Sequence, residues 1–153
     1  MVDITEISAI VTATGVLVGV IYYILEIRHQ NKIRQTDLIM RLYSAFESKE
    51  FQDAWVETLR LEFKDYNEYL KKYGANAEKP VYTSVNMVAG FFEGIGILLH
   101  RKLVDITLVD DLFSSDIMIT WHKMKPLVEG WRKHFTRPQI WEWFEYLYNE
   151  MQK

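Results

Sequence analysis

A chain of 153 residues with a formal net charge of -3 and no cysteine excludes several classes of protein. Without cysteine there is no disulfide scaffold, no thiol nucleophile and no Cys-ligated zinc or iron–sulfur site. The net charge provides no basic field to attract nucleic acid, and 49% hydrophobic residues with only 7 Gly and 3 Pro exclude a disordered or collagen-like chain.

The first predicted element is an apolar helix near the N-terminus. The 19 residues from Ile7 to Leu25 carry no ionisable side chain except the phenols of Tyr22 and Tyr23. At about 1.5 Å per residue, such a helix matches a hydrocarbon core of roughly 30 Å, and tyrosines at its end are typical of a membrane interface. We therefore predict a transmembrane anchor in residues 1–28.

A cleaved signal peptide and a buried helix of a soluble protein are the two alternatives. The residues before the apolar run include Asp3 and Glu6 but no Lys or Arg, and no small-x-small cleavage site follows it, which disfavours a signal peptide. Buried soluble helices are usually shorter. We therefore expect an uncleaved anchor.

The flanking charges predict the orientation of this anchor. No Lys or Arg precedes the apolar run, whereas Arg28, Lys32, Arg34 and Arg41 follow it closely. The positive-inside rule then places the N-terminus outside and residues 29–153 in the cytoplasm, on the inner side of the cell membrane.

Small residues form a stripe on the predicted anchor. Ser8, Thr12, Gly15 and Gly19 are spaced by 4, 3 and 4 residues and share one side of a helix. Two helix backbones can approach closely at such a stripe, so it indicates association with a second copy or with another membrane protein. The alternative is that Gly and Thr are simply common in membrane helices, since GxxxG is a frequent pattern.

Residues 29–153 are predicted to form an all-helical domain. The first helix is expected to run from about Ile4 to Phe46, since apolar residues recur at helical spacing and no Gly or Pro intervenes between Gly19 and Gly74. Later helices are predicted after a Ser48 cap, from Asp65 to Gly74, from about Val81 to Arg101 and from Pro138, with a loop at residues 74–80. The predicted fold is all-α, an N-terminal transmembrane helix continuing into a compact bundle of about five further helices.

The region after residue 104 is predicted to contain a short and a long helix. Thr107 to Asp110 resembles a capping box, which starts a short helix ending at Phe113, and Ser115 then caps the next one. Pro126 is expected to kink that helix without ending it. Its predicted buried seam consists of Ile117, Trp121, Met124, Val128, Trp131 and Phe135.

The stretch AGFFEGIGILLHR contains the only candidate for acid–base chemistry. Three glycines in one helix, Gly90, Gly94 and Gly96, are costly and predict a closely packed neighbour. Glu93 then lies near that contact, either bonded to an Arg, Trp or backbone partner or acting as an acid or base with His100, two turns away. A lone carboxylate needs a second group and a pocket, which favours the structural role.

No metal or cofactor site is predicted. Glu26 and His29 form one Glu-x-x-His pair, whereas a di-iron bundle needs two such pairs and two more Glu. The remaining histidines, His100, His122 and His134, show no zinc-binding spacing.

The C-terminal segment WEWFEYLYNE is dense in aromatic residues. If Trp141, Phe144 and Tyr148 are buried, then Trp143 and Tyr146 point elsewhere and form a possible partner surface. The alternative is that a small helical domain buries all five.

Four segments carry a resemblance to a known family. They are LYSAFESKEFQDAW, FFEGIGILLHRKLVD, LFSSDIMITWHKMKP and FEYLYNE. In these the chain resembles the prokaryotic DUF4760 family, a domain of unknown function, over nearly its whole length. The resemblance implies a membrane helix followed by a small all-helical head and a bacterial or archaeal source. It implies no activity, substrate or functional residue.

The function that we predict is that of a single-pass, membrane-anchored protein without enzymatic activity. It would act as an interaction or scaffold protein, or as an accessory subunit of a membrane assembly, through the anchor or the head. Its predicted partners are the lipid bilayer and itself or another membrane protein, with no nucleic acid and no small-molecule substrate. The alternative is a membrane-tethered enzyme or ligand sensor using Glu93 and His100.

Overall fold

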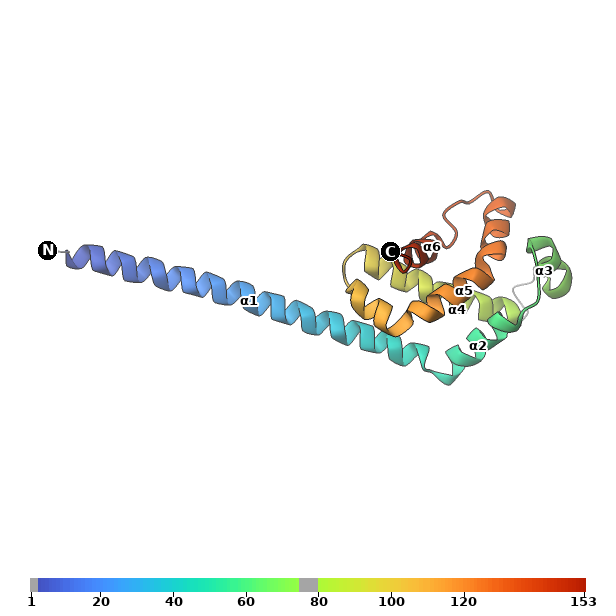
Figure 1. The fold of residues 1–153 in the computed structure, drawn as a ribbon, viewed down its shortest axis with the longest axis horizontal. Helices are drawn as coiled ribbons and strands as arrows, with labels where there is room; N and C mark the ends of the chain where they lie inside the picture. Colours follow the sequence, from blue (N-terminus) through green and yellow to red (C-terminus); the bar gives the residue numbers. More distant parts are fainter. Residues whose placement is uncertain (1–2, 75–79) are drawn as a thin grey trace. The chain divides into compact units, whose positions relative to one another are not determined.

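The computed structural model describes residues 3–74 and 80–153 of the chain. Every regular element in these residues is an α-helix, as predicted, and no strand occurs among them (Figure 1). The helices are α1 (Ile4–Phe46), α2 (Lys49–Arg60), α3 (Tyr66–Tyr73), α4 (Pro80–His100), α5 (Ile106–His134) and α6 (Glu142–Glu150). The predicted loop at residues 74–80 lies mostly outside the described residues, and α4 begins at Pro80.

The chain divides into two compact units, Met1–Asp37 and Leu38–Lys153. α1 is one continuous helix of 43 residues with the predicted bounds, and it contributes to both units. The other five helices, α2 to α6, all belong to the second unit, so the predicted number of further helices is confirmed in the described part of the chain. The predicted boundary after residue 28 concerns the membrane and stays a prediction.

Capping residues mark the start of α2 and both ends of α3 where the sequence indicated. The Ser48 hydroxyl accepts a hydrogen bond from the backbone N–H of Phe51 at 3.2 Å and thereby caps α2. Asp65 does the same for α3 through the N–H of Glu68 at 2.9 Å. Gly74 ends α3 with φ at 76°, a conformation that glycine adopts without a steric penalty. The predicted cap at Ser48 and the predicted helix ends at Asp65 and Gly74 are therefore confirmed.

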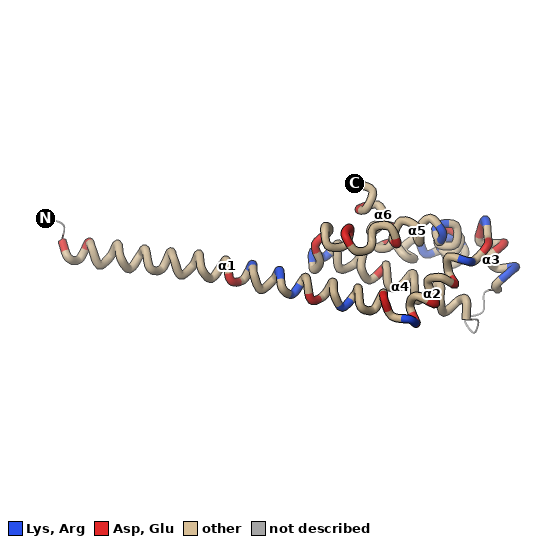
Figure 2. The backbone as a smooth tube through the Cα atoms, turned by 60° about the horizontal axis from the view of Figure 1, so that its bottom comes forward, with Lys and Arg blue, Asp and Glu red and all other residues tan. Residues whose placement is uncertain are grey.

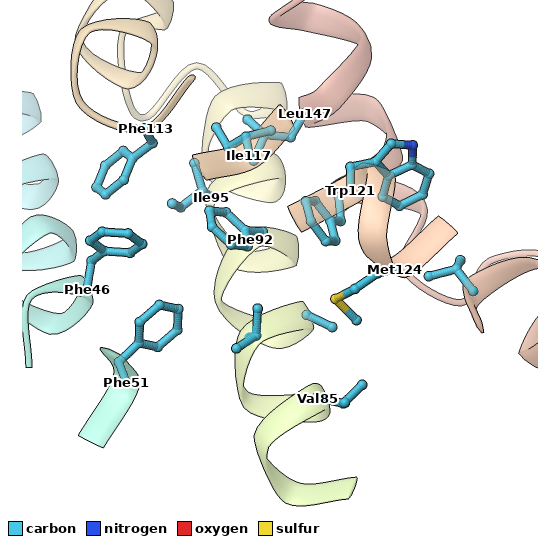
Figure 3. Packing of buried hydrophobic residues seen from close by; sticks show 14 of the residues in the cluster. Phe46, Phe51, Val85, Phe92, Ile95, Phe113, Ile117, Trp121, Met124 and Leu147 are labelled. Atoms are coloured by element: carbon cyan, nitrogen blue, oxygen red, sulfur yellow. The ribbon is translucent and has the colours of Figure 1, made fainter. Parts of the chain in front are cut away.

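The core of the second unit is built around α4, which packs against α2 and α6. Five of its apolar residues, which recur at helical spacing, are all buried: Val85, Val88, Phe92, Ile95 and Leu99. Figure 3 shows Phe46 between Phe51 and Phe113, and the ring centroids lie 5.3 and 5.5 Å away from that of Phe46. Burial of these large apolar side chains is the main driving force for folding of this unit.

The prediction of two helices between residues 107 and 135 is wrong. Asp105, not Thr107, is the N-cap, and its carboxylate accepts a hydrogen bond from the N–H of Thr107 at 2.8 Å. A single helix of 29 residues follows and passes through Ser115. Val109, Phe113 and Ile117 are all buried at helical spacing, so core packing keeps this segment helical where serine would by itself favour a cap.

The seam of α5 is confirmed except at its end. Ile117, Trp121, Met124, Val128 and Trp131 are buried, as predicted. Phe135 is 55% exposed because α5 ends at His134. The helix continues through Pro126, as expected for an internal proline that kinks a helix without ending it.

The last helix begins four residues later than predicted. α6 starts at Glu142, and the segment from Pro138 to Trp141 forms turns instead. Trp141 occupies the N-cap position in the left-handed region, with φ at 55°, and its side chain makes no capping hydrogen bond. The position of this helix start therefore depends on a partner from elsewhere in the chain.

Candidate functional site

The first half of α1 presents apolar side chains without a partner in the chain. Every residue from Asp3 to Leu25 is exposed. Figure 2 shows this stretch without Lys, Arg, Asp or Glu between Glu6 and Glu26. An exposed apolar surface of this size is not stable in water and indicates a lipid or protein environment.

Length and composition alone allow two interpretations of α1. Two helices among the described residues are long and apolar enough to cross a membrane, α1 and α4. α4 is a core helix of the second unit, and such helices pass the same test. For α1, which lies near the N-terminus, a membrane span and a signal sequence both meet the criterion.

Three hydroxyl side chains of this half bond to their own helix. The hydroxyls of Ser8, Thr12 and Thr14 donate to the carbonyls of Thr5, Ser8 and Ile10 at 3.0, 2.8 and 2.8 Å. Each of these hydroxyl groups already donates its hydrogen bond within the helix. None of them therefore needs water as an acceptor, which is what an apolar environment requires.

The predicted small-residue stripe is open along α1. A Cβ added at Gly15 or Gly19 would meet nothing within 4 Å. Both glycines therefore leave space that another helix backbone could fill.

A close approach of two helices occurs at only one of the three glycines of α4. A Cβ at Gly96 would overlap the backbone carbonyl oxygen of Trp143 in α6. A Cβ at Gly90 or Gly94 would meet nothing within 4 Å, so the predicted close packing is wrong there. Gly96 thus sets the distance at which α6 crosses α4.

Glu93 lies one turn before this crossing and caps α6. Its carboxylate accepts a hydrogen bond from the backbone N–H of Phe144 at 2.7 Å. Phe144 is the third residue of α6, where an N-cap side chain normally bonds, and Trp141 supplies no such bond. Burial raises the pKa of Glu93, while the N–H groups of Phe144 and Trp143 act in the opposite direction. Glu93 is thus half-buried and bonded to the backbone, the arrangement expected for the structural role.

His100 contacts aromatic rings at the end of α4. Its ring centroid lies 4.4 Å from that of Trp143 and 5.4 Å from that of Tyr146. Trp143 and Tyr146 are half-buried and also contact each other, with their centroids 6.0 Å apart. Glu93 and His100 are seven residues apart in one helix, or about 10 Å along its axis, so they do not share a proton directly.

One ion pair of the head was not foreseen from the sequence. Arg132 carries a charge, yet only 19% of its side chain is exposed. It donates to a carboxylate oxygen of Glu145 at 2.7 Å and to the carbonyl of Ile140 at 2.9 Å. These contacts join α5 to α6 and to the segment that leads into it, and no spacing within the sequence signals them.

Glycine also marks the contact of α3 with α5. A Cβ at Gly130 would overlap the side chain of Tyr66, whose ring lies 5.6 Å from that of His134. An open surface hollow beside this contact is lined by residues of both charge signs, including Lys64, Asp65, Glu129 and Lys133. In the part of the chain that the structure describes, no three His, Asp or Glu side chains converge as metal ligands would.

Comparison with known proteins identifies a family. The family model described as domain of unknown function (DUF4760) matches residues 10–151, which confirms the resemblance seen in the sequence. No curated protein and no solved structure matches the chain. Because the match extends from within the apolar half of α1 to the end of α6, the chain belongs to the DUF4760 family over nearly its whole length.

Proposed function

We propose that this protein is anchored in the cell membrane by the first half of α1 and acts without enzymatic activity, as an interaction protein or accessory subunit of a membrane assembly. The observation that carries the proposal is the fully exposed apolar run from Ile7 to Leu25. The hydroxyls of its Ser8, Thr12 and Thr14 are bonded to the helix backbone, and the run is long enough for a bilayer.

The charges that follow the run support an orientation with the N-terminus outside. Arg28, Lys32 and Arg34 are exposed, and no Lys or Arg precedes Ile7. Positive side chains next to a span remain on the cytoplasmic side during insertion. The helical unit Leu38–Lys153 would then lie in the cytoplasm.

The contacts of Glu93 favour an interaction protein over an enzyme. An acid or base needs access to a substrate, whereas the Glu93 carboxylate is bonded to the N–H of Phe144 and half-buried against α6. His100 is packed against Trp143 and Tyr146. The small-residue stripe of α1 and the aromatic residues around His100 are the two surfaces that we propose for partners.

Labelling of intact cells tests this topology. The chain has no cysteine, so single cysteines at Val2 and at Lys153 can be introduced without removing any. We expect an impermeant thiol reagent to label position 2 but not position 153, and the protein to stay in the membrane on alkaline extraction. Labelling at position 153 alone would contradict the orientation. Loss of residue 2 from the mature chain would identify a signal sequence instead.

A further inference from the structure

A second exposed face of α1 lies beyond the apolar run, within the first unit. Ile33 is an apolar residue in a polar stretch of the sequence, and 55% of it is exposed. A shallow hollow along this face is lined by His29, Lys32, Ile33, Thr36 and Asp37, and apolar atoms make up most of its surface. An isolated exposed isoleucine would need no explanation, but an apolar hollow on a helix face is a feature of helix–helix contacts.

This face continues the register of the small-residue stripe. Ile33 follows Gly15 by 18 residues, about five turns of an α-helix, so both have the same direction from the axis. Positions spaced alternately by 3 and 4 residues connect the two: Thr12, Gly15, Gly19, Tyr22, Glu26, His29, Ile33 and Thr36. Such a series forms one seam when two helices supercoil about each other.

The charges beside Ile33 suit a parallel copy of the same helix. Lys32 and Asp37 flank the seam on opposite sides and are five residues apart. In a parallel helix pair, this spacing brings Lys32 of one copy next to Asp37 of the other, twice by symmetry. An antiparallel pair would not produce this match, and insertion into one membrane makes all copies parallel.

Glu26 lowers the stability of this helix pair and at the same time restricts it to one register. It lies on the seam, and its carboxylate accepts a hydrogen bond from Gln30 at 3.0 Å in the same helix. Two such carboxylates approach each other in the pair, which weakens it. A single polar residue at a seam position excludes other registers at a cost in stability.

We propose that two copies of this protein associate in parallel through α1, with Ile33 at the centre of the contact outside the membrane span and reciprocal Lys32–Asp37 ion pairs beside it. The inference rests on the proposed anchoring, because the bilayer imposes the parallel direction. It extends that proposal by naming a second copy as the partner and residues 29–37 as part of the contact.

Cysteine crosslinking in native membranes tests the contact. We expect full-length Ile33→Cys to form a disulfide-linked dimer on mild oxidation, since a disulfide requires Cβ atoms about 3.5–4.5 Å apart. Asn31→Cys, on the opposite side of α1, is the matched control and should not crosslink. Equal crosslinking at both positions would overturn the proposal, as would a crosslink from Ile33→Cys to a different protein.

Charge exchange tests the ion pairs in the Ile33→Cys chain. We expect Lys32→Glu or Asp37→Lys alone to lower the dimer yield by about 3- to 10-fold, since attractive contacts become repulsive. The double exchange should restore the yield, and failure to restore it would overturn the pairing. If the chain resists alkaline extraction but does not crosslink at Ile33, this inference fails while the anchoring stands. If it is extracted, both fail.

Discussion

Glu93 and Gly96 act on the same helix end from one turn of α4. Glu93 supplies the capping oxygen that α6 lacks locally, and Gly96 provides the space for the carbonyl of Trp143. Neither role needs a catalytic property of the carboxylate. Together they explain why this helix starts at Glu142 and not near Pro138.

Replacing Gly96 with Ala should destabilise the protein by about 1–3 kcal/mol, because the new methyl group overlaps backbone that cannot move aside easily. Gly90→Ala is the matched control. It adds the same methyl group in the same helix where nothing lies within 4 Å, and it should be neutral or stabilising by up to about 1 kcal/mol. Thermal unfolding in detergent compares the two, and equal effects would mean that α6 does not cross α4 at Gly96.

Among the helices, α5 shows how packing overrides local signals. Its sequence contains two serines and a proline, yet it forms one helix from Ile106 to His134. Trp121 lies at the middle of its buried face, with its ring centroid 5.0 Å from that of Phe144 and 5.8 Å from that of Tyr148. Two residues of α6 therefore pack against this one side chain of α5.

Trp121→Ala should cost about 3–5 kcal/mol of stability, which is a large part of the stability of a small domain. Lys125→Ala, one turn further along α5, is exposed and should change stability by less than about 0.5 kcal/mol. The measurement is the thermal or denaturant midpoint of each variant. Similar midpoints for both would show that the buried face of α5 is assigned to the wrong side.

The span of α1 allows a separate test of helix association. Replacing Gly15 and Gly19 together with Leu keeps the helix apolar, so membrane insertion should be unharmed. It also fills the stripe, and we expect loss of crosslinked self-dimers or of a membrane partner in native membranes. Normal association of this variant would leave the stripe without a role and would favour the aromatic surface at Trp143 and Tyr146.

The protein consists of an exposed apolar half of α1 and a helical unit with its own hydrophobic core. The second unit buries large side chains from all of its helices, and Figure 3 shows part of this cluster around Phe92 and Ile117. In that unit, burial raises the pKa of two carboxyls, Glu93 and Asp116. An acid whose pKa is raised by folding stabilises the protein fully below its unfolded pKa and loses this contribution as the pH rises.

We therefore expect the thermal midpoint of the protein in detergent to fall as the pH is raised from the ordinary Glu value of 4.5 through the higher folded-state pKa. Glu93→Gln, which keeps an acceptor oxygen for the N–H of Phe144, should reduce this pH dependence. Glu68 has an effect of the opposite sign on stability. Its ion pair with Lys72 lowers its pKa, so its contribution to stability is lost as the pH falls below 4.5. An unchanged slope in Glu93→Gln would show that Glu93 does not contribute.

Local patterns were sufficient to predict most helices of this protein. Apolar residues at helical spacing predicted α1 and α4 closely, and Ser48, Asp65 and Gly74 marked helix ends, because a cap acts within three or four residues of itself. The length and composition of α1 likewise follow from the sequence alone. Membership of the DUF4760 family was recognisable from the same patterns.

Contacts between distant residues decided the rest. Glu93 meets Phe144 across 51 residues, and Arg132 meets Glu145 from another helix, so neither bond leaves a periodic signal in the sequence. The start of α6, the single close approach at Gly96 and the packing of Trp143 against His100 all depend on where α4 and α6 cross. A crossing point is set by the fit of two complete helix surfaces, which exists only once the chain has folded.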